Sequence, residues 1–104
     1  MYSIEDKGDC SIYTFNGIDL KLKSVEKKDE VFVFIEYKGK DPLLSMLFGD
    51  FGAECELDNI DFEVRTEGGI RYAVVSKDHL TGFIKEVYFF VMENKNVLDK
   101  IVWS

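Results

Sequence analysis

Apolar and polar residues alternate along much of this chain, and this period of two constrains the fold more than any other feature of the sequence. In a β-strand, side chains two positions apart point to the same face, so the alternation predicts strands that bury one face. Residues 11–15 and 18–22 alternate in this way on either side of Asn16-Gly17, a dipeptide that favours a two-residue type I′ turn. We therefore predict a β-hairpin in this region.

The remaining elements are predicted from the same pattern and from the content of β-branched and aromatic residues. Strands are expected over residues 31–37, in a hairpin over 53–65, and over residues 70–76, 84–92 and 97–103. Residues 77–82 are predicted as a loop. One short helix is predicted at about 42–48, because Asp41 suits an N-cap, Pro42 the first helical position and Gly49 the end of a helix.

These elements predict a mainly β fold. Most connections are too short for a parallel crossover, so the sheet should be antiparallel. Residues 31–37 and 84–92 are apolar on both faces, which a sheet with one solvated face cannot accommodate. We expect a curved antiparallel sheet of about eight strands, partly closed like a barrel or sandwich, with the short helix against one side. With one Pro and no low-complexity stretch, residues 1–104 should form a single domain.

Composition favours a packed, cytoplasmic domain. The chain is 46% hydrophobic and contains nine Phe, enough apolar surface to form a core. Its first residues lack the basic start and apolar run of a signal peptide, and its longest apolar run, 87–92, is too short to span a membrane. In the cytoplasm, Cys10 and Cys55 are expected to be reduced. A single His without a CxxC motif argues against a zinc site.

Negative charge is concentrated in residues 50–67, which we call the acidic segment. It contains seven acidic residues and one basic residue, a net charge of −6, whereas the whole chain has a net charge of −7. The rest of the chain is therefore nearly neutral, with thirteen acidic and twelve basic residues. The charged residues of the segment are Asp50, Glu54, Glu56, Asp58, Asp61, Glu63, Arg65 and Glu67.

A two-residue turn at Asp58-Asn59 would give the predicted hairpin one apolar and one acidic face. Its apolar face would carry Ala53, Cys55, Leu57, Ile60, Phe62 and Val64. A slip by one residue would bury the charges instead, so this register is favoured. It sets Glu56 opposite Asp61 and Glu54 opposite Glu63, and like charges so placed cost about 0.2–1 kcal/mol per pair.

Three interpretations of this acidic face stay open. The face is a solvated surface, with Arg65 and Arg71 offsetting part of the repulsion. Alternatively, it binds a cationic partner, which it would steer electrostatically. The third possibility is a site for a hard cation such as Ca²⁺, although residues 58–63 lack the spacing and the central Gly of an EF-hand loop.

Other candidate groups do not indicate an enzyme. His79 is the only His, and neither it nor Ser76 lies in a nucleophile motif. Paired carboxylates on a solvated face lack the apolar pocket that raises a catalytic pKa. Gly68-Gly69 is interpreted as part of a turn, because no helix follows it to hold a phosphate. We expect no catalytic activity, no cofactor and no metal.

The predicted turn at Gly68-Gly69 also sets a register. A three-residue connection through residues 67–69 would put Ile70, Tyr72 and Val74 on the same face as Phe62, Val64 and Thr66.

Direct nucleic-acid binding is disfavoured, because the net charge is −7 and the basic residues are scattered along the chain. The aromatic residues Phe32, Phe34, Tyr88 and Phe90 either form ordinary core or line a ligand cavity inside the curved sheet. Tyrosines and Trp103 are the natural anchors of a protein interface.

A small acidic β-rich domain without catalytic motifs, carrying an acidic face on a hairpin, resembles the immunity proteins of bacterial contact-dependent growth inhibition and related polymorphic toxin systems. The resemblance covers size and character over the whole chain and involves no signature motif. It implies that the chain binds a cognate basic toxin domain, expected to be an RNase or DNase, and blocks its active site. The implied partner-binding residues are Glu54, Glu56, Asp58, Asp61 and Glu63, with Asp50 and Glu67 at the rim.

Two alternatives to an immunity protein stay open. An acidic nucleic-acid mimic that inhibits a host defence nuclease would use the same electrostatics, and only genomic neighbourhood would separate the two. A small-molecule-binding β domain would need an enclosed pocket of at least ~300 Å³ with converging polar groups. We expect a monomer, although an exposed edge strand could pair with another chain.

Overall fold

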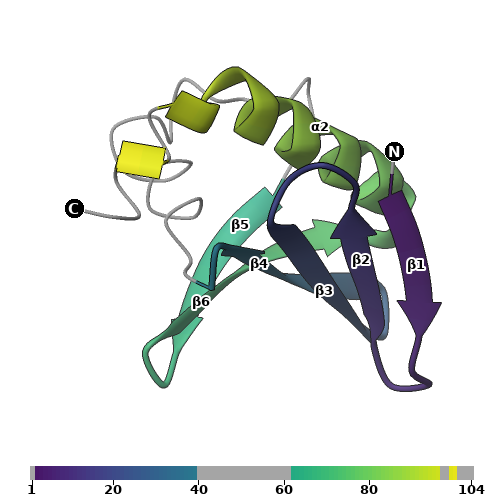
Figure 1. Cartoon of the computed structure of the whole chain (residues 1–104). Helices are drawn as coiled ribbons and strands as arrows, with labels where there is room; N and C mark the ends of the chain where they lie inside the picture. Colours follow the sequence, from purple (N-terminus) through teal and green to yellow (C-terminus); the bar gives the residue numbers. More distant parts are fainter. Residues whose placement is uncertain (1, 40–61, 97–98, 101–104) are drawn as a thin grey trace.

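A computed structural model describes residues 2–39, 62–96 and 99–100. In these residues the chain forms one open antiparallel sheet, and a long helix lies across one face of it (Figure 1). The elements are β1 (Tyr2–Asp6), β2 (Ser11–Phe15), β3 (Leu20–Lys27), β4 (Glu30–Tyr37), β5 (Phe62–Glu67), β6 (Ile70–Ser76), the short 3-10 helix η1 (Lys77–His79) and α2 (Leu80–Glu93).

The strand order is β1-β2-β3-β4-β6-β5, and every neighbouring pair is antiparallel. The predicted mainly β class and antiparallel pairing are therefore confirmed. The predicted closure is wrong, because the described strands form a single open sheet in which β1 and β5 lie at opposite ends of the strand order. Within the described residues the sheet has six strands, fewer than the predicted eight or so. A helix covers one apolar face of the sheet, and Phe32 and Phe34 on the other face are half-buried.

Several predicted elements fall on residues that are not described. The helix at 42–48 lies outside the described residues, as does most of the 53–65 hairpin. The strand predicted at 97–103 is wrong at Asp99 and Lys100, which are helical.

The predicted strand at 84–92 is a helix, and this is the largest error in the sequence prediction. The β-branched and aromatic content of the segment favours a strand, but its burial follows the helical period. The side chains of α2 that are buried against the sheet are Phe83, Ile84, Val87, Phe90 and Val91. This spacing of three to four residues places all of them on one face of a helix. The predicted loop at 77–82 is also wrong, since η1 and the first turn of α2 occupy it.

The first predicted hairpin is confirmed, but its turn is longer than two residues. Tyr13 pairs with Leu22, which leaves four residues between the last residue of β2 and Leu20. Gly17 has a φ of +83°, as the turn chemistry requires. Ile18 is not part of a strand. Its partly buried side chain packs against the core and so anchors the loop to it.

The sequence prediction missed β1. Four of its five side chains are exposed, so the strand lacks the buried alternation that marked the others. It is held by pairing with β2, in which Ile4 lies opposite Tyr13. Tyr2 also packs its ring against Phe15, with ring centroids 5.2 Å apart.

The predicted register between residues 62–67 and 70–76 is wrong by one residue. Gly68 and Gly69 both have positive φ, so they form a two-residue turn in which Glu67 pairs with Ile70. As a result Phe62 lies opposite Val75, whereas Tyr72 lies opposite Arg65 on the other face. The two glycines satisfy the type I′ geometry by themselves, so the connection does not need Glu67.

The core lies between the sheet and α2 (Figure 1). It consists of alternate residues of β2, β3, β4 and β6 together with the buried face of the helix. Its members are Tyr13, Phe15, Leu20, Leu22, Val31, Val33, Ile35, Tyr37, Ala73, Val75, Phe83, Ile84, Val87, Phe90 and Val91. Phe15 and Tyr88 stack across the layers, with ring centroids 5.3 Å apart.

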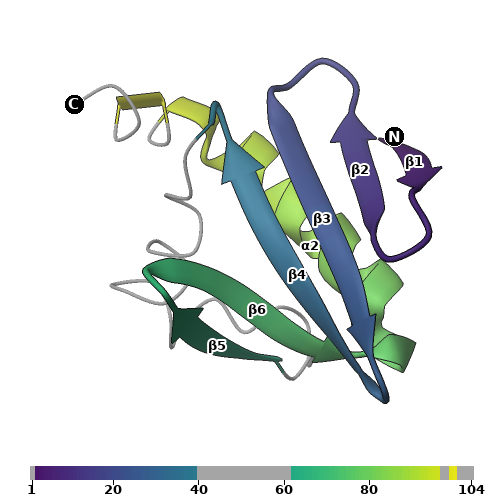
Figure 2. The same cartoon turned by 90° about the horizontal axis from the view of Figure 1, so that it is seen from below.

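The face of the sheet opposite α2 also carries apolar side chains. Figure 2 shows this face, with the helix behind the strands. Phe32 and Phe34 of β4 point to it and pack on Tyr72 of β6, at centroid distances of 4.9 and 5.2 Å. The prediction that 31–37 is apolar on both faces is therefore confirmed: one face meets α2, and the other forms an aromatic cluster.

Candidate functional sites

The described part of the acidic segment forms edge strand β5. Of the seven predicted partner-binding carboxylates, Glu63 and Glu67 are described, and both are exposed on the face opposite α2. The inward neighbour Phe62 packs against the core, as the predicted polarity of this strand requires. The other five lie outside the described residues: Asp50, Glu54, Glu56, Asp58 and Asp61.

Glu63 has an intramolecular partner. Arg65 donates from Nε to Glu63 Oε1 at 2.8 Å and from Nη2 to the same carboxylate, and Nη2 also lies 3.4 Å from Glu30 Oε2 on β4. The guanidinium lies 5.7 Å from the centre of the Phe32 ring. Its hydrogen bonds to Glu63 raise the pKa of Arg65 above its ordinary value. Arg65 therefore offsets part of the local repulsion, as the sequence suggested.

Glu67 is held in a similar way. Tyr72 donates its hydroxyl to Glu67 Oε2 at 3.1 Å. Burial and this hydrogen bond raise the pKa of Tyr72, so the phenol keeps its proton and remains a donor. Both described carboxylates of the segment are thus exposed yet ordered, Glu63 by Arg65 of the same strand and Glu67 by Tyr72 of β6.

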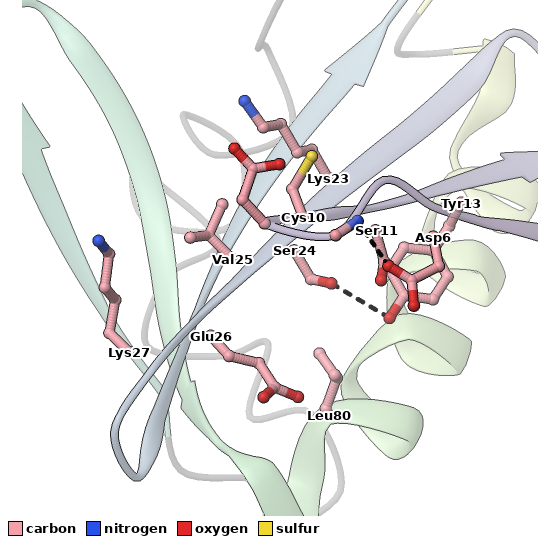
Figure 3. A pocket seen from close by; sticks show the side chains of 12 residues that line it. Asp6, Cys10, Ser11, Tyr13, Lys23, Ser24, Val25, Glu26, Lys27 and Leu80 are labelled. Carbon is pink, nitrogen blue, oxygen red and sulfur yellow. Dashed lines mark hydrogen bonds between the residues drawn. The ribbon is translucent and has the colours of Figure 1, made fainter.

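A polar notch of about 620 Å³ lies at the other end of the sheet (Figure 3). β2 starts at Ser11, which pairs with Ser24 of β3, whereas β3 continues along β4 as far as Lys27. The notch occupies the space that β2 leaves, beside the turn between β1 and β2. It is lined by Asp6, Gly8, Asp9, Cys10, Ser11, Tyr13, Lys23, Ser24, Val25, Glu26, Lys27 and Leu80.

Two buried hydroxyls lie at this notch. Ser24 donates to the Tyr13 hydroxyl at 3.2 Å, and both side chains are at most 6% exposed. Since the Tyr13 oxygen accepts this bond, its own proton is free to bond a ligand. Sequence reasoning missed these residues because no motif joins them. One signal was available in the sequence. Leu20 and Leu22 alternate with polar residues, so position 24 is expected to be apolar, but it is the polar Ser24.

The four aromatic residues considered for a ligand cavity lie on opposite faces of the sheet. Phe90 is buried in the core and Tyr88 stacks on Phe15. Phe32 and Phe34 lie on the opposite face of the sheet, so these four aromatic residues do not surround a common space.

The remaining sequence candidates are dispersed. His79 is exposed at the end of η1, and Cys10 is a half-buried free thiol. Among residues 2–39, 62–96 and 99–100, no three His, Cys, Asp or Glu side chains gather as a metal site would require. Within the same ranges, no helix has both the length and the apolar character needed to cross a bilayer.

Tyr37 and Asp99 join the end of β4 to the chain beyond α2. Tyr37 is fully buried and donates its hydroxyl to Asp99 Oδ1 at 2.5 Å, and the Lys38 ammonium lies 2.9 Å from the same oxygen. Burial and the bond to Asp99 raise the pKa of Tyr37 to about 12. The same bond, with Lys38, lowers the pKa of the Asp99 carboxyl. This arrangement is a structural clamp, since it opens into neither of the sites above.

We expect the clamp to govern stability at both extremes of pH. The lowered pKa of Asp99 stabilises the fold above the ordinary carboxyl pKa of about 4, and this contribution is lost as pH falls further. The raised pKa of Tyr37 gives a contribution that is complete below about pH 10 and lost as pH rises towards 12. Tyr37→Phe should lower the free energy of unfolding by about 1 kcal/mol at pH 7. It should also make that free energy fall less as pH rises from about 10 towards 12.

Urea unfolding followed by circular dichroism across this pH range measures the loss of stability at acid and at alkaline pH. Asp99→Asn should reduce the loss of stability at acid pH, and Tyr88→Phe, which removes a half-buried phenol outside the clamp, serves as the control for general alkaline effects. If Tyr37→Phe loses stability at alkaline pH as wild type does, the clamp is contradicted.

No family model, curated protein or solved structure matches this chain. Its function is therefore inferred from the chemistry of its own surfaces.

Proposed function

We propose that this chain is an immunity protein that binds a cognate basic toxin domain, expected to be a nuclease, and neutralises it through the acidic segment. One observation carries the proposal: residues 50–67 hold a net charge of −6 in a chain of net charge −7. A charge so concentrated attracts a basic partner and raises its association rate.

The described end of the segment supports this use. Glu63 keeps 59% of its side chain exposed although Arg65 holds it, so a partner cation can approach it without unfolding anything. The bonds from Arg65 and Tyr72 also fix the Glu63 and Glu67 carboxylates before binding. Pre-ordered side chains lose less entropy on association.

The proposed mechanism is occupation of a phosphate-binding cleft. Carboxylates accept paired hydrogen bonds from Arg and charge-assisted bonds from Lys, as phosphates do. Glu54, Glu56, Asp58, Asp61 and Glu63 would stand where the substrate's phosphates bind, with Asp50 and Glu67 at the rim of the contact. Because the nuclease needs those cations for its substrate, binding inhibits it directly. The chain itself performs no catalysis in this proposal.

The first test is affinity capture from a lysate of the source organism, with elution by rising salt. Wild type and a variant with Glu54→Gln, Glu56→Gln, Asp61→Asn and Glu63→Gln serve as parallel baits. A basic nuclease retained by wild type alone and released by salt is the expected result. Equal capture by both baits, or by neither, would contradict the acidic-face mechanism. If the captured target is a defence nuclease and not a toxin, the chain is the acidic mimic instead.

A second candidate function is the binding of a small polar molecule in the notch. Its support is the buried Tyr13–Ser24 hydroxyl pair at a space of about 620 Å³, which exceeds the size threshold for a ligand site. Free amino acids and monosaccharides, titrated one at a time, are suitable probes. A saturable change in the NMR signals of Tyr13, Ser24 and Glu26 that Tyr13→Phe abolishes would favour this function. No saturable change with any probe would count against it.

A further inference from the structure

A second groove, of about 470 Å³, lies on the face of the sheet opposite α2. Figure 2 shows the strands that bound it, β3, β4 and β6, with the helix behind them. The lining of this groove includes none of the carboxylates of the acidic segment and shares only Lys23 with the notch. The groove is lined by Ile12, Lys21, Lys23, Phe34, Ile35, Glu36, Gly39, Gly69, Ile70 and Arg71.

The apolar part of the groove is unusually open to solvent. Ile70, at the start of β6, is 58% exposed, among the most exposed large apolar side chains in the described part of the chain. Ile12 and Phe34 are half-buried and line the same groove. The groove therefore offers apolar side chains that an incoming apolar group could cover, and removing them from water favours binding.

The charge of the groove is opposite to that of the chain. Lys21, Lys23 and Glu36 lie at strand positions that face the groove, a local charge of +1 in a chain of −7. Arg71 also borders the groove, but the alternation along β6 turns its side chain to the face of α2. Lys21 and Lys23 are exposed, and within the described residues neither forms an ion pair. The Lys23 ammonium lies 5.7 Å from the centre of the Phe34 ring, so a cation and an apolar surface are already side by side.

We propose that this groove binds an extended peptide segment of a protein partner in which an acidic residue lies two positions from a large apolar residue. Side chains two apart in an extended chain share a face and lie roughly 7 Å apart. The carboxylate would meet Lys21 and Lys23 on β3, and the apolar side chain would cover Phe34 and Ile70. This inference depends on the groove alone and not on the acidic segment.

A nucleic acid is the less suitable anion. Its affinity comes mainly from many phosphate contacts, and a short row of lysines beside a net charge of −7 provides few of them. A single carboxylate with an apolar neighbour uses both chemistries of the groove, whereas a phosphate backbone would leave Ile70 uncovered.

The probe is the peptide Ac-Ser-Glu-Thr-Phe-Ser-NH₂, titrated into the full-length ¹⁵N-labelled protein and followed by NMR. We expect saturable shifts at Lys21, Lys23, Phe34 and Ile70, with a Kd on the order of 1 mM, as suits a short flexible ligand. Replacing Glu by Gln in the peptide should weaken binding roughly tenfold, because one charge-assisted contact is lost.

Matched protein variants complete the test. Lys21→Gln with Lys23→Gln should weaken binding roughly tenfold, whereas Lys7→Gln with Lys77→Gln, which removes two exposed lysines outside the groove, should not. Ile70→Ser should weaken binding without unfolding the protein, since Ile70 is exposed. Absent or non-saturable shifts, equal binding of the Gln peptide, or shifts caused by oligothymidylate but not by the peptide would each overturn the proposal.

Discussion

Phe83→Ala is expected to lower the free energy of unfolding by about 3–5 kcal/mol. Phe83 is fully buried between α2 and the sheet, and its ring packs 5.4 Å from the ring of Phe62 on β5. Truncation leaves a cavity that the sheet cannot fill without breaking its pairing. Because a domain of this size has about 5–15 kcal/mol in total, the variant should unfold at much lower urea concentration.

Phe89→Ala is the matched control, with the same substitution in the same helix. Phe89 is 44% exposed and its ring meets Tyr88 at the surface, so its loss should cost less than about 1 kcal/mol. The pair also distinguishes the helix from a strand that would extend the predicted 84–92 by one residue to Phe83. Six residues along a strand return to the same face, whereas six residues along a helix turn through about 240°. Similar costs for the two substitutions would contradict the helix and support the strand.

The sequence was sufficient where a local signal decides the structure. Asn16-Gly17 located the first hairpin, and the β-branched and aromatic content of 31–37 and 70–76 placed two internal strands correctly. It was insufficient where tertiary contacts decide. Residues 84–92 have strand-like content, and only packing against a sheet selects the helical face formed by Phe83 and Val87. That helix covers one apolar face of residues 31–37, and the aromatic cluster of Phe32, Phe34 and Tyr72 partly covers the other, so the sheet stays open.

The site could be predicted only in part, for a similar reason. The concentration of charge in the acidic segment is a property of composition, so the sequence displays it directly. The contacts around its described carboxylates cannot be predicted from composition. Arg65, which holds Glu63, also reaches Glu30 because the strand order β4-β6-β5 brings the two strands near each other. The groove beside Lys21 and Ile70 joins residues far apart in the sequence, and its charge is hidden within an acidic total.

The acidic face should dominate the affinity for the partner. Neutralising four carboxylates should weaken binding by at least about 3 kcal/mol, since close interfacial charge pairs couple by about 1.5–7 kcal/mol each. The substitutions are Glu54→Gln, Glu56→Gln, Asp61→Asn and Glu63→Gln. Calorimetry with the captured partner at two salt concentrations measures the loss. The wild-type affinity should fall steeply with salt, and that of the variant should change little.

A matched variant separates the local effect from the net charge. Glu5→Gln, Asp29→Asn, Asp78→Asn and Glu93→Gln change the total charge equally, at exposed positions outside the segment. This control should slow association slightly and leave the affinity within a few tenths of a kcal/mol.

Stability provides the second readout of the same variant. Predicted cross-strand repulsion costs about 0.2–1 kcal/mol per pair, and the exposed Glu63–Arg65 ion pair that is lost contributes little, because solvent screens it. The two effects oppose each other, so the neutralised protein should fold as well as wild type or slightly better. A variant that binds weakly yet is equally stable locates the loss in the contact itself. If it binds as tightly as wild type, the carboxylates are a solvated face, and the partner must be recognised through another surface.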